Sequence, residues 1–209
     1  CWILKKKLIT VVLVILISVF TLASHIVGGD MYYDYLGNDN YRITVVIFRD
    51  CASTGAAYDN PMNLGVFDMG KNLVREISIP FPGSQVLSVV LNNPCVTPPT
   101  GICTEQAIYT RVINLPPSFG GYTISYQRCC RGPNITNLIA PEDTGLTLTV
   151  NITGTGSNAL VNSSPRFKNY PPLVICNNDQ LVFDHSATDL DGDELIYELI
   201  TPYAGASDV

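Results

Sequence analysis

The sequence predicts an all-β fold, an antiparallel β-sandwich, from three observations. Apolar and polar residues alternate with period two through most of the chain after residue 25, as they do in half-buried strands. Turns rich in Gly, Asn, Asp and Pro separate these segments at near-regular spacing. No segment after residue 25 has the apolar period of a helix, and parallel strands need such crossover segments, so we expect antiparallel sheets.

The first residues predict an export signal. Lys5, Lys6 and Lys7 precede an apolar run over residues 8–20, and Ala23 and Ser24 are small residues suited to cleavage. The run is short for a membrane span, which needs about 20 apolar residues. We expect a signal peptide over residues 1–24 and no membrane insertion after its cleavage; the alternative is an uncleaved N-terminal anchor.

The charge balance of the mature chain is acidic. Removing the three signal lysines leaves nine of the 12 basic residues against all 18 acidic ones, a net charge near −9. An acidic chain without a basic cluster is not expected to bind nucleic acid or an anionic membrane. The balance suits a solvated surface protein or one that binds divalent cations.

Two segments, residues 31–36 and 41–50, are expected to form the first hairpin. Gly37 and the three polar residues after it tolerate the positive φ of a tight turn. In residues 41–50, Tyr41, Ile43, Val45 and Ile47 share one face. The other face is mixed, so this strand is expected to be buried on both sides toward its end.

The remaining strands follow the same pattern of alternation and turns. The sequence predicts pairs at residues 63–68 and 73–79, and at residues 105–115 and 121–129, with further strands at 85–91 and 146–152. Many short strands divided by Gly and Pro turns are typical of sandwiches, so an immunoglobulin-like or jelly-roll-like domain is expected over residues 25–165.

A composition change between residues 163 and 172 predicts a domain boundary. Residues 169–172 (Asn-Tyr-Pro-Pro) have the composition of a linker, and alternation resumes at residues 180–183 and 194–200. We expect residues 166–209 to be the start of a second, truncated β domain of immunoglobulin-like, PKD-like or cadherin-like type.

Six cysteines remain after the signal, and an even number in an exported chain predicts disulfides. They are Cys51, Cys95, Cys103, Cys129, Cys130 and Cys176. The short loop with prolines between Cys95 and Cys103 predicts that these two pair. Cys129 and Cys130 are expected to point to opposite faces of one strand and to bond different partners, with Cys51 and Cys176 remaining. Zinc is the weaker alternative, since no Cys-x-x-Cys pair is present.

An acidic cluster predicts a calcium site. Asp189, Asp191 and Asp193 stand at alternate positions, Gly192 allows a tight bend, and Asp184 is a possible fourth ligand. Calcium prefers six to eight oxygen ligands in a flexible loop. The spacing is not that of an EF-hand, and the alternative is an acidic, solvated turn.

Two short motifs resemble parts of catalytic sites. Residues 143–145 (Asp-Thr-Gly) match the aspartic-protease triplet, but no second copy exists, so we interpret them as a turn. Residues 184–186 (Asp-His-Ser) contain the residue types of a catalytic triad, but neighbours in sequence cannot form the relay. The sequence therefore predicts no catalytic residues and no enzymatic activity.

Five motifs resemble the N-terminal region of long exported proteins of Bacteroidota associated with gliding motility and type IX secretion. They are residues 24–30 (Ser-His-Ile-Val-Gly-Gly-Asp), 48–51 (Phe-Arg-Asp-Cys), 122–131, 164–167 and 183–189. The resemblance implies a large surface or secreted protein with PKD-like, cadherin-like or immunoglobulin-like repeats. It also implies that the acidic cluster is similar to the calcium loops of such repeats.

Three functions are compatible with the sequence. We expect a non-catalytic, extracellular or cell-surface module with a structural or adhesive role, whose partners are a surface polysaccharide or other cell-surface proteins. The alternatives are a carbohydrate-binding accessory module of a secreted enzyme and, least favoured, a hydrolase.

Overall fold

The computed structural model describes residues 26–53, 55–89, 99–132, 135–156, 161–176, 180–203 and 205. The predicted signal peptide, residues 1–24, lies outside the described residues, as does Cys95. Within the described part of the chain, no helix is long and apolar enough to cross a membrane.

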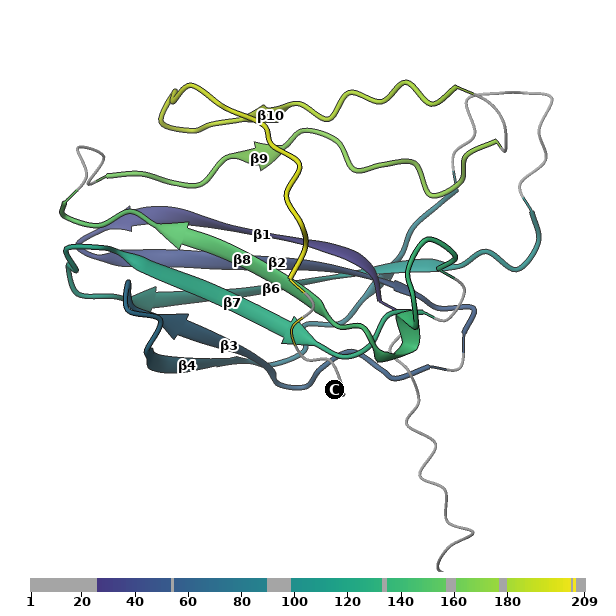
Figure 1. The fold of residues 1–209 in the computed structure, drawn as a ribbon, viewed down its shortest axis with the longest axis horizontal. Coiled ribbons are helices and arrows are strands. Elements are labelled where there is room, and N and C mark those ends of the chain that lie inside the picture. The colour runs from purple at the N-terminus through teal and green to yellow at the C-terminus, as the bar shows by residue number, and fades with distance from the viewer. Residues whose placement is uncertain are drawn as a thin grey trace, which may run out of the picture.

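The fold is all-β, as predicted, with two four-stranded sheets and a two-stranded one (Figure 1). The first sheet has the order β1-β2-β6-β5, the second β4-β3-β7-β8, and β9 pairs with β10. Every ladder between these strands is antiparallel. The elements are β1 (Ile26–Gly37), β2 (Asn40–Asp50), β3 (Met62–Phe67), β4 (Leu73–Ile79), β5 (Gln85–Val86), β6 (Thr104–Asn114), β7 (Tyr122–Arg128), a 3-10 helix (Pro141–Asp143), β8 (Leu146–Ile152), β9 (Arg166–Phe167) and β10 (Ala187–Thr188).

Most predicted strands are confirmed to within a few residues. The first hairpin turns where expected, with positive φ at Gly37, Asn38 and Asp39. Strand β1 begins five residues earlier than predicted, because Gly28, Gly29 and their neighbours continue the ladder with β2. Strand β5 has only two residues instead of the predicted seven.

The core lies between the inner faces of the two four-stranded sheets. Alternation places Ile43, Val45 and Ile47 of β2 toward the second sheet, where Leu64 and Ile124 meet them, and all five are fully buried. Four core tyrosines are also buried, and three of them almost completely: Tyr33, Tyr109 and Tyr126, with Tyr41 slightly more exposed. Burial of large side chains from both sheets is the main stabilising contribution of such a sandwich.

A polar network holds the loop between β2 and β3 at one end of the sandwich. Arg49 forms a largely buried ion pair with Glu105, at 2.6 Å, and its guanidinium also donates to the carbonyl oxygens of residues 55 and 56. Asp59 accepts a hydrogen bond from the hydroxyl of Tyr126 at 2.6 Å and pairs with Arg128 at 3.0 Å. The charged side chains of this loop region therefore serve as structural links.

The predicted bond between Cys95 and Cys103 is wrong, since Cys103 is bonded to Cys51. The register of β2 and β6 explains the difference. Asp50 lies opposite Thr104, so the next residue on each chain, Cys51 and Cys103, meet with Cα atoms 5.0 Å apart. Strand pairing, and not loop length, selects the partner.

The prediction that Cys129 and Cys130 bond different partners is also wrong, because they are bonded to each other. Strand β7 ends at Arg128, so the alternation of side chains on which the prediction rested stops before the two cysteines. Cys176 is exposed and bonded to no other described cysteine. Full pairing of the six cysteines stays a prediction, and it now requires a bond between Cys176 and Cys95.

The described residues after 160, which we name the C-terminal arm, run along the outside of the sandwich. Figure 1 shows β9 and β10 stacked over β1 and β2 as a third layer. The predicted strands at residues 180–183 and 194–200 are not formed; the only strands in the arm are β9 and β10. Residues 180–183 and 194–200 have no backbone ladder beside them, without which an extended segment is not a strand. A second domain over residues 166–209 stays a prediction.

Candidate functional site

The C-terminal arm is fastened to the edge strand β1 by backbone and side-chain hydrogen bonds. The N–H of Tyr33 donates to the hydroxyl of Ser164 at 2.7 Å, and the N–H of Ser164 donates to the carbonyl of Tyr33 at 3.0 Å. The N–H of Tyr35 donates to the hydroxyl of Ser163 at 3.2 Å. These bonds satisfy part of the open edge of the first sheet, which would otherwise be free to pair with another chain.

Beyond this edge the arm crosses the outer face of the first sheet. Arg166 pairs with Asp34, and its guanidinium lies over the ring of Tyr32, 4.8 Å from the centroid. Farther along, the ring of Tyr170 meets that of Phe48 edge to face at 5.0 Å. The sequence prediction that the β2 segment is buried on both sides is confirmed, since Val46, on the outer face, is only 2% exposed.

A cleft of about 820 Å³ lies between the outer face of the first sheet and the arm. Its size falls in the range of small-molecule binding sites. The β-strand side contributes a glycine pair, an acid, an aromatic ring and two neutral polar side chains, and the arm contributes aromatic and proline rings. The described lining is Val27, Gly28, Gly29, Asp30, Phe48, Leu87, Ser88, Thr104, Gln106, Phe167, Tyr170, Pro171, Pro172, Leu173 and His185.

Gly28 opens the cleft. A Cβ atom built on Gly28 would meet no atom within 4 Å, whereas one on Gly29 would lie 2.7 Å from the carbonyl oxygen of Val46. Gly29 therefore allows the close approach of β1 to β2, and Gly28 leaves space in the cleft. A side chain at position 28 would fill that space without backbone strain.

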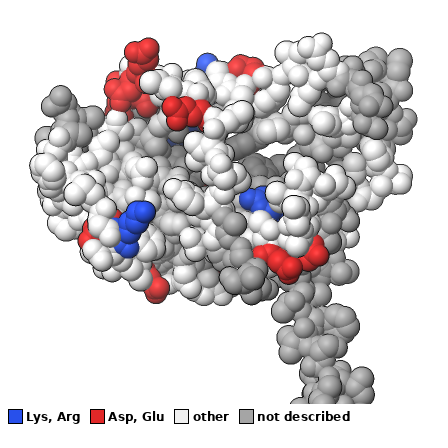
Figure 2. All heavy atoms as spheres, in the orientation of Figure 1, with Lys and Arg blue, Asp and Glu red and all other residues white. Residues whose placement is uncertain are grey.

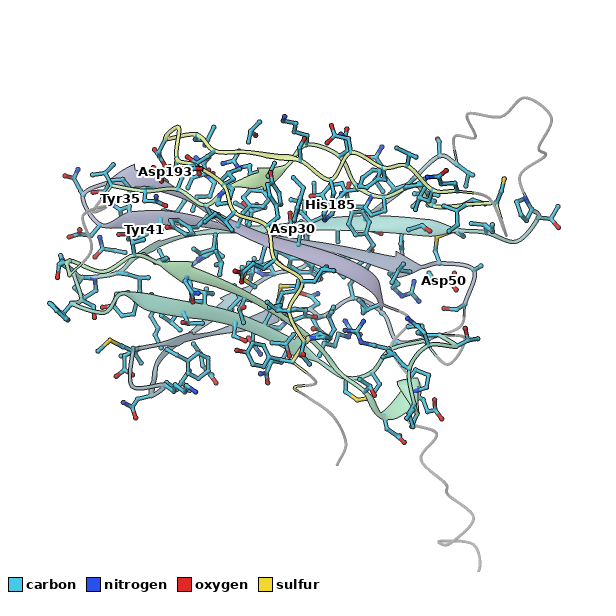
Figure 3. All side chains as sticks on the ribbon, turned by 45° about the horizontal axis from the view of Figure 1, so that its top comes forward. Asp30, Tyr35, Tyr41, Asp50, His185 and Asp193 are labelled. Carbon is cyan, nitrogen blue, oxygen red and sulfur yellow. A yellow bond between two sulfur atoms is a disulfide. The ribbon has the colours of Figure 1, made fainter. Side chains whose placement is uncertain are left out.

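Asp30 of β1 and His185 of the arm both line the cleft, and Figure 3 labels them near each other; Tyr170 is the third titratable group of the described lining. Burial raises the pKa of Asp30, while the N–H of Met31 and the nearby His185 act in the opposite direction. The imidazole of His185 stacks on the ring of Phe167, with centroids 4.2 Å apart. Burial, with Asp30 and Tyr32 nearby, raises the pKa of Tyr170 to about 12, so its phenol stays neutral at physiological pH.

The cleft is thus a mostly apolar, aromatic-lined surface with a few polar groups. Aromatic faces stack on sugar rings or receive cations, and neutral polar side chains fix orientation by hydrogen bonds. Residues 184–186 contain the residue types of a catalytic triad. Here the backbone N–H of Ser186 donates to the Asp184 carboxylate at 3.0 Å, and the ring of His185 stacks on Phe167. The three side chains are not arranged as a relay.

The acidic cluster lies away from the cleft, since Figure 3 shows Asp193 toward the end of the molecule that holds Tyr35 and Tyr41. One carboxylate oxygen of Asp189 accepts the N–H groups of Asp191 and Asp193, at 2.8 and 3.1 Å. Asp191 accepts the N–H of Ser163 at 2.6 Å, and Asp193 accepts the side-chain amide of Asn162 at 2.7 Å.

These bonds give the cluster a structural role that the sequence did not predict, because they tie the acidic loop to the segment that covers the edge of β1. No group of three or more His, Cys, Asp or Glu residues in the described part of the chain is placed to hold a metal ion. Asp184 is engaged separately with Ser186. Calcium binding at Asp184, Asp189, Asp191 and Asp193 stays a prediction.

A second, smaller cleft of about 180 Å³ lies at the end of the sandwich, with Tyr35, Tyr41 and Tyr122 in its lining. The hydroxyl of Tyr122 donates to the carbonyl of Pro116 at 2.8 Å, and the rings of Tyr35 and Tyr41 are tilted at 5.3 Å. These rings pack against one another and leave less room than the cleft beneath the arm.

Sequence reasoning missed the cleft residues as a group. Asp30 and Phe48 belong to motifs that suggested a family, but no spacing rule brings them near residues 167–173. Residues 169–172 were interpreted as a linker from their prolines, although Tyr170 packs on the sheet. The available signal for this contact was Tyr170, an aromatic residue within a Pro-rich segment that otherwise looks exposed.

No protein-family model, no curated protein and no solved structure matches this chain.

Proposed function

We propose that the chain is a non-catalytic, exported module of a surface or secreted protein, and that it binds a polysaccharide in the cleft beneath the arm. The observation that carries this proposal is the aromatic-lined cleft itself, which Phe48, Phe167 and Tyr170 form with hydrogen-bonding side chains from β6. An adhesive role requires a ligand site on a stable framework. The Cys51–Cys103 disulfide and the buried ion pairs supply that framework.

Export to the cell surface or the extracellular space is part of the same proposal. The signal-like residues 1–24, the disulfides and the resemblance to gliding-motility-associated proteins support it. Figure 2 shows few charged side chains on the face it presents. Antibody labelling of intact producing cells tests this part. Labelled cells, or protein recovered from the medium, support export, and absence of the protein from both the surface and the medium contradicts it.

The cleft also supports the alternative, a carbohydrate-binding accessory module attached to a secreted enzyme. Both functions require the same ligand site, so binding alone does not separate them. They differ in location: the first expects the protein to stay on the cell surface, and the second expects it to accompany a hydrolytic activity in the medium.

Filling the cleft is expected to abolish polysaccharide binding without unfolding the protein. The variant Gly28→Leu places a side chain in open space, so the midpoint of thermal unfolding should be unchanged. Affinity for the best ligand of a panel of neutral, acidic and amino-sugar oligosaccharides should fall about tenfold or more, the equivalent of 1.4 kcal/mol. Isothermal titration calorimetry measures it.

Thr110→Leu is the matched control. Thr110 lies on the same outer face, opposite Thr44 in the ladder, and is outside the cleft lining. The control should bind as the wild-type protein does. If the panel contains no ligand, or if Gly28→Leu and Thr110→Leu bind equally well, the proposed site is wrong.

Calcium is expected to stabilise the acidic loop. A cation that binds only the folded loop raises stability by about 2.7 kcal/mol at a hundredfold excess over Kd, and extracellular modules work with Kd near 10⁻⁴–10⁻³ M. Millimolar calcium should raise the melting temperature, and Asp191→Ala should remove the calcium-dependent part. The same concentration of magnesium is the control for ionic strength. Identical melting curves with calcium and with chelator would leave the aspartates with their hydrogen-bonding role alone.

A further inference from the structure

The cleft beneath the arm contains one acid that forms no ion pair with a described residue. Asp30 is the only Asp or Glu in its described lining, and no Lys or Arg lines it. The four ion pairs of the described residues use Asp34, Glu105 and Asp59, and none uses Asp30. His185 is near enough to lower the pKa of Asp30, but none of these ion pairs joins the two residues. The carboxylate is therefore half-buried and forms no ion pair with a described Lys, Arg or His.

A half-buried carboxylate is costly unless a hydrogen-bonded cation accompanies it. The surroundings of Asp30 suit an organic ammonium group better than a hydrated metal ion. The rings of Phe48 and Tyr170, whose centroids are 5.0 Å apart, lie in the same lining. Aromatic faces attract ammonium groups through the ring quadrupole, and a carboxylate completes the pair with a charge-assisted hydrogen bond.

The remaining polar groups suit the hydroxyls of a sugar. Thr104, Gln106 and Ser88 are neutral donors and acceptors in the lining of the cleft. They come from β6 and from the segment after β5, on the far side of Phe48 from β1. Such a set fixes the position of a hydroxylated ring by hydrogen bonds without adding charge.

We propose that the ligand of the cleft is an oligosaccharide of amino sugars with free amines, whose ammonium group pairs with Asp30 while its rings stack on Phe48 and Tyr170. This inference rests on the proposed function, because it names the class of polysaccharide that the same site binds. An N-acetylated sugar has lost the positive charge of the amine, and a neutral sugar never carries it. Both kinds of sugar should therefore bind less tightly than the sugar with the free amine.

The test compares three trimers of the same β-1,4 linkage: glucosamine, N-acetylglucosamine and glucose. Titration calorimetry is run at slightly acidic pH, at which the sugar amines are protonated, and at physiological ionic strength, which screens distant charges. The glucosamine trimer should bind about tenfold to a hundredfold more tightly than the other two, as a hydrogen bond to a charged group predicts. His185 and Tyr170 are the other titratable groups that face Asp30.

Two isosteric variants separate a local effect from the overall acidity of the protein. Asp30→Asn keeps an oxygen for the N–H of Met31 and should remove the preference for the amine while leaving binding of the neutral trimers unchanged. Asp143→Asn makes the same change of net charge at an exposed residue outside the cleft and should keep the preference.

The outcomes distinguish this inference from the proposed function. If the neutral trimers bind as tightly as the amine, or if Asp143→Asn lowers the preference as much as Asp30→Asn, the ammonium site is wrong and a sugar-binding cleft stands. If no sugar binds at all, the proposed function fails as well. If a lysine-containing peptide binds more tightly than the glucosamine trimer, the ammonium site stands and its source is a protein, which overturns the amino-sugar assignment.

Discussion

Removal of the disulfide between Cys51 and Cys103 is expected to lower the free energy of unfolding by about 4 kcal/mol. The bond joins residues 52 apart in sequence, and a cross-link of that span removes much of the conformational freedom of the unfolded chain. The double variant Cys51→Ala/Cys103→Ala should retain the fold, because the β2–β6 ladder continues through Asp50 and Thr104. Urea unfolding followed by circular dichroism measures the loss.

The single variants provide the control for the assigned partner. If Cys51 and Cys103 are bonded to each other, either single replacement breaks the same bond, so each should cost about as much as the double variant. Additive costs of the two single variants would contradict the pairing. Peptide mapping of the unreduced protein should find these two cysteines in one cross-linked fragment.

Raising the pH from 10 to 12 is expected to destabilise the fold by several kcal/mol through its buried tyrosines. Burial raises the pKa of Tyr33 and of Tyr109 to about 12, against about 10 in the unfolded chain. The folded protein keeps both phenols neutral while the unfolded chain ionises them, so their contribution is fully present below pH 10. It is lost as the pH rises toward 12, at about 2–3 kcal/mol for each residue.

Tyr109→Phe tests this pH dependence at one residue. The hydroxyl of Tyr109 donates to the carbonyl of Asp59 at 2.8 Å, so its removal should cost about 1 kcal/mol at neutral pH. The variant should then lose less stability than the wild-type protein between pH 10 and pH 12. Equal losses for the two proteins would show that the Tyr109 phenol is not protected from ionisation.

The strands were predictable because their information is local. In β2 and β6 the alternation of apolar and polar residues coincides with the pleat, so the side chains of Ile43 and Tyr109 reach the core as the pattern predicts. The turn between β1 and β2 was equally local, since Gly37, Asn38 and Asp39 are residue types that tolerate the positive φ found there.

The disulfide partners and the cleft were not predictable because their information is non-local. The partner of Cys103 depends on the register of two strands more than 50 residues apart. The meeting of Tyr170 with Phe48 depends on the path of the arm over the first sheet, for which neither residue carries a local signal. The aspartates were identified by their spacing, yet their hydrogen bonds to Asn162 and Ser163 depend on the same path.

Amide chemical-shift mapping by nuclear magnetic resonance shows whether the cleft between the first sheet and the arm is the ligand site. On titration with the glucosamine trimer, we expect the largest shifts at Gly28 and Asp30 of β1, at Gln106 of β6 and at Tyr170 of the arm. These residues come from separate segments and meet only in the cleft. Shifts confined to the small tyrosine cleft around Tyr122, or shifts in the arm without any in β1 and β6, would show that the ligand binds elsewhere.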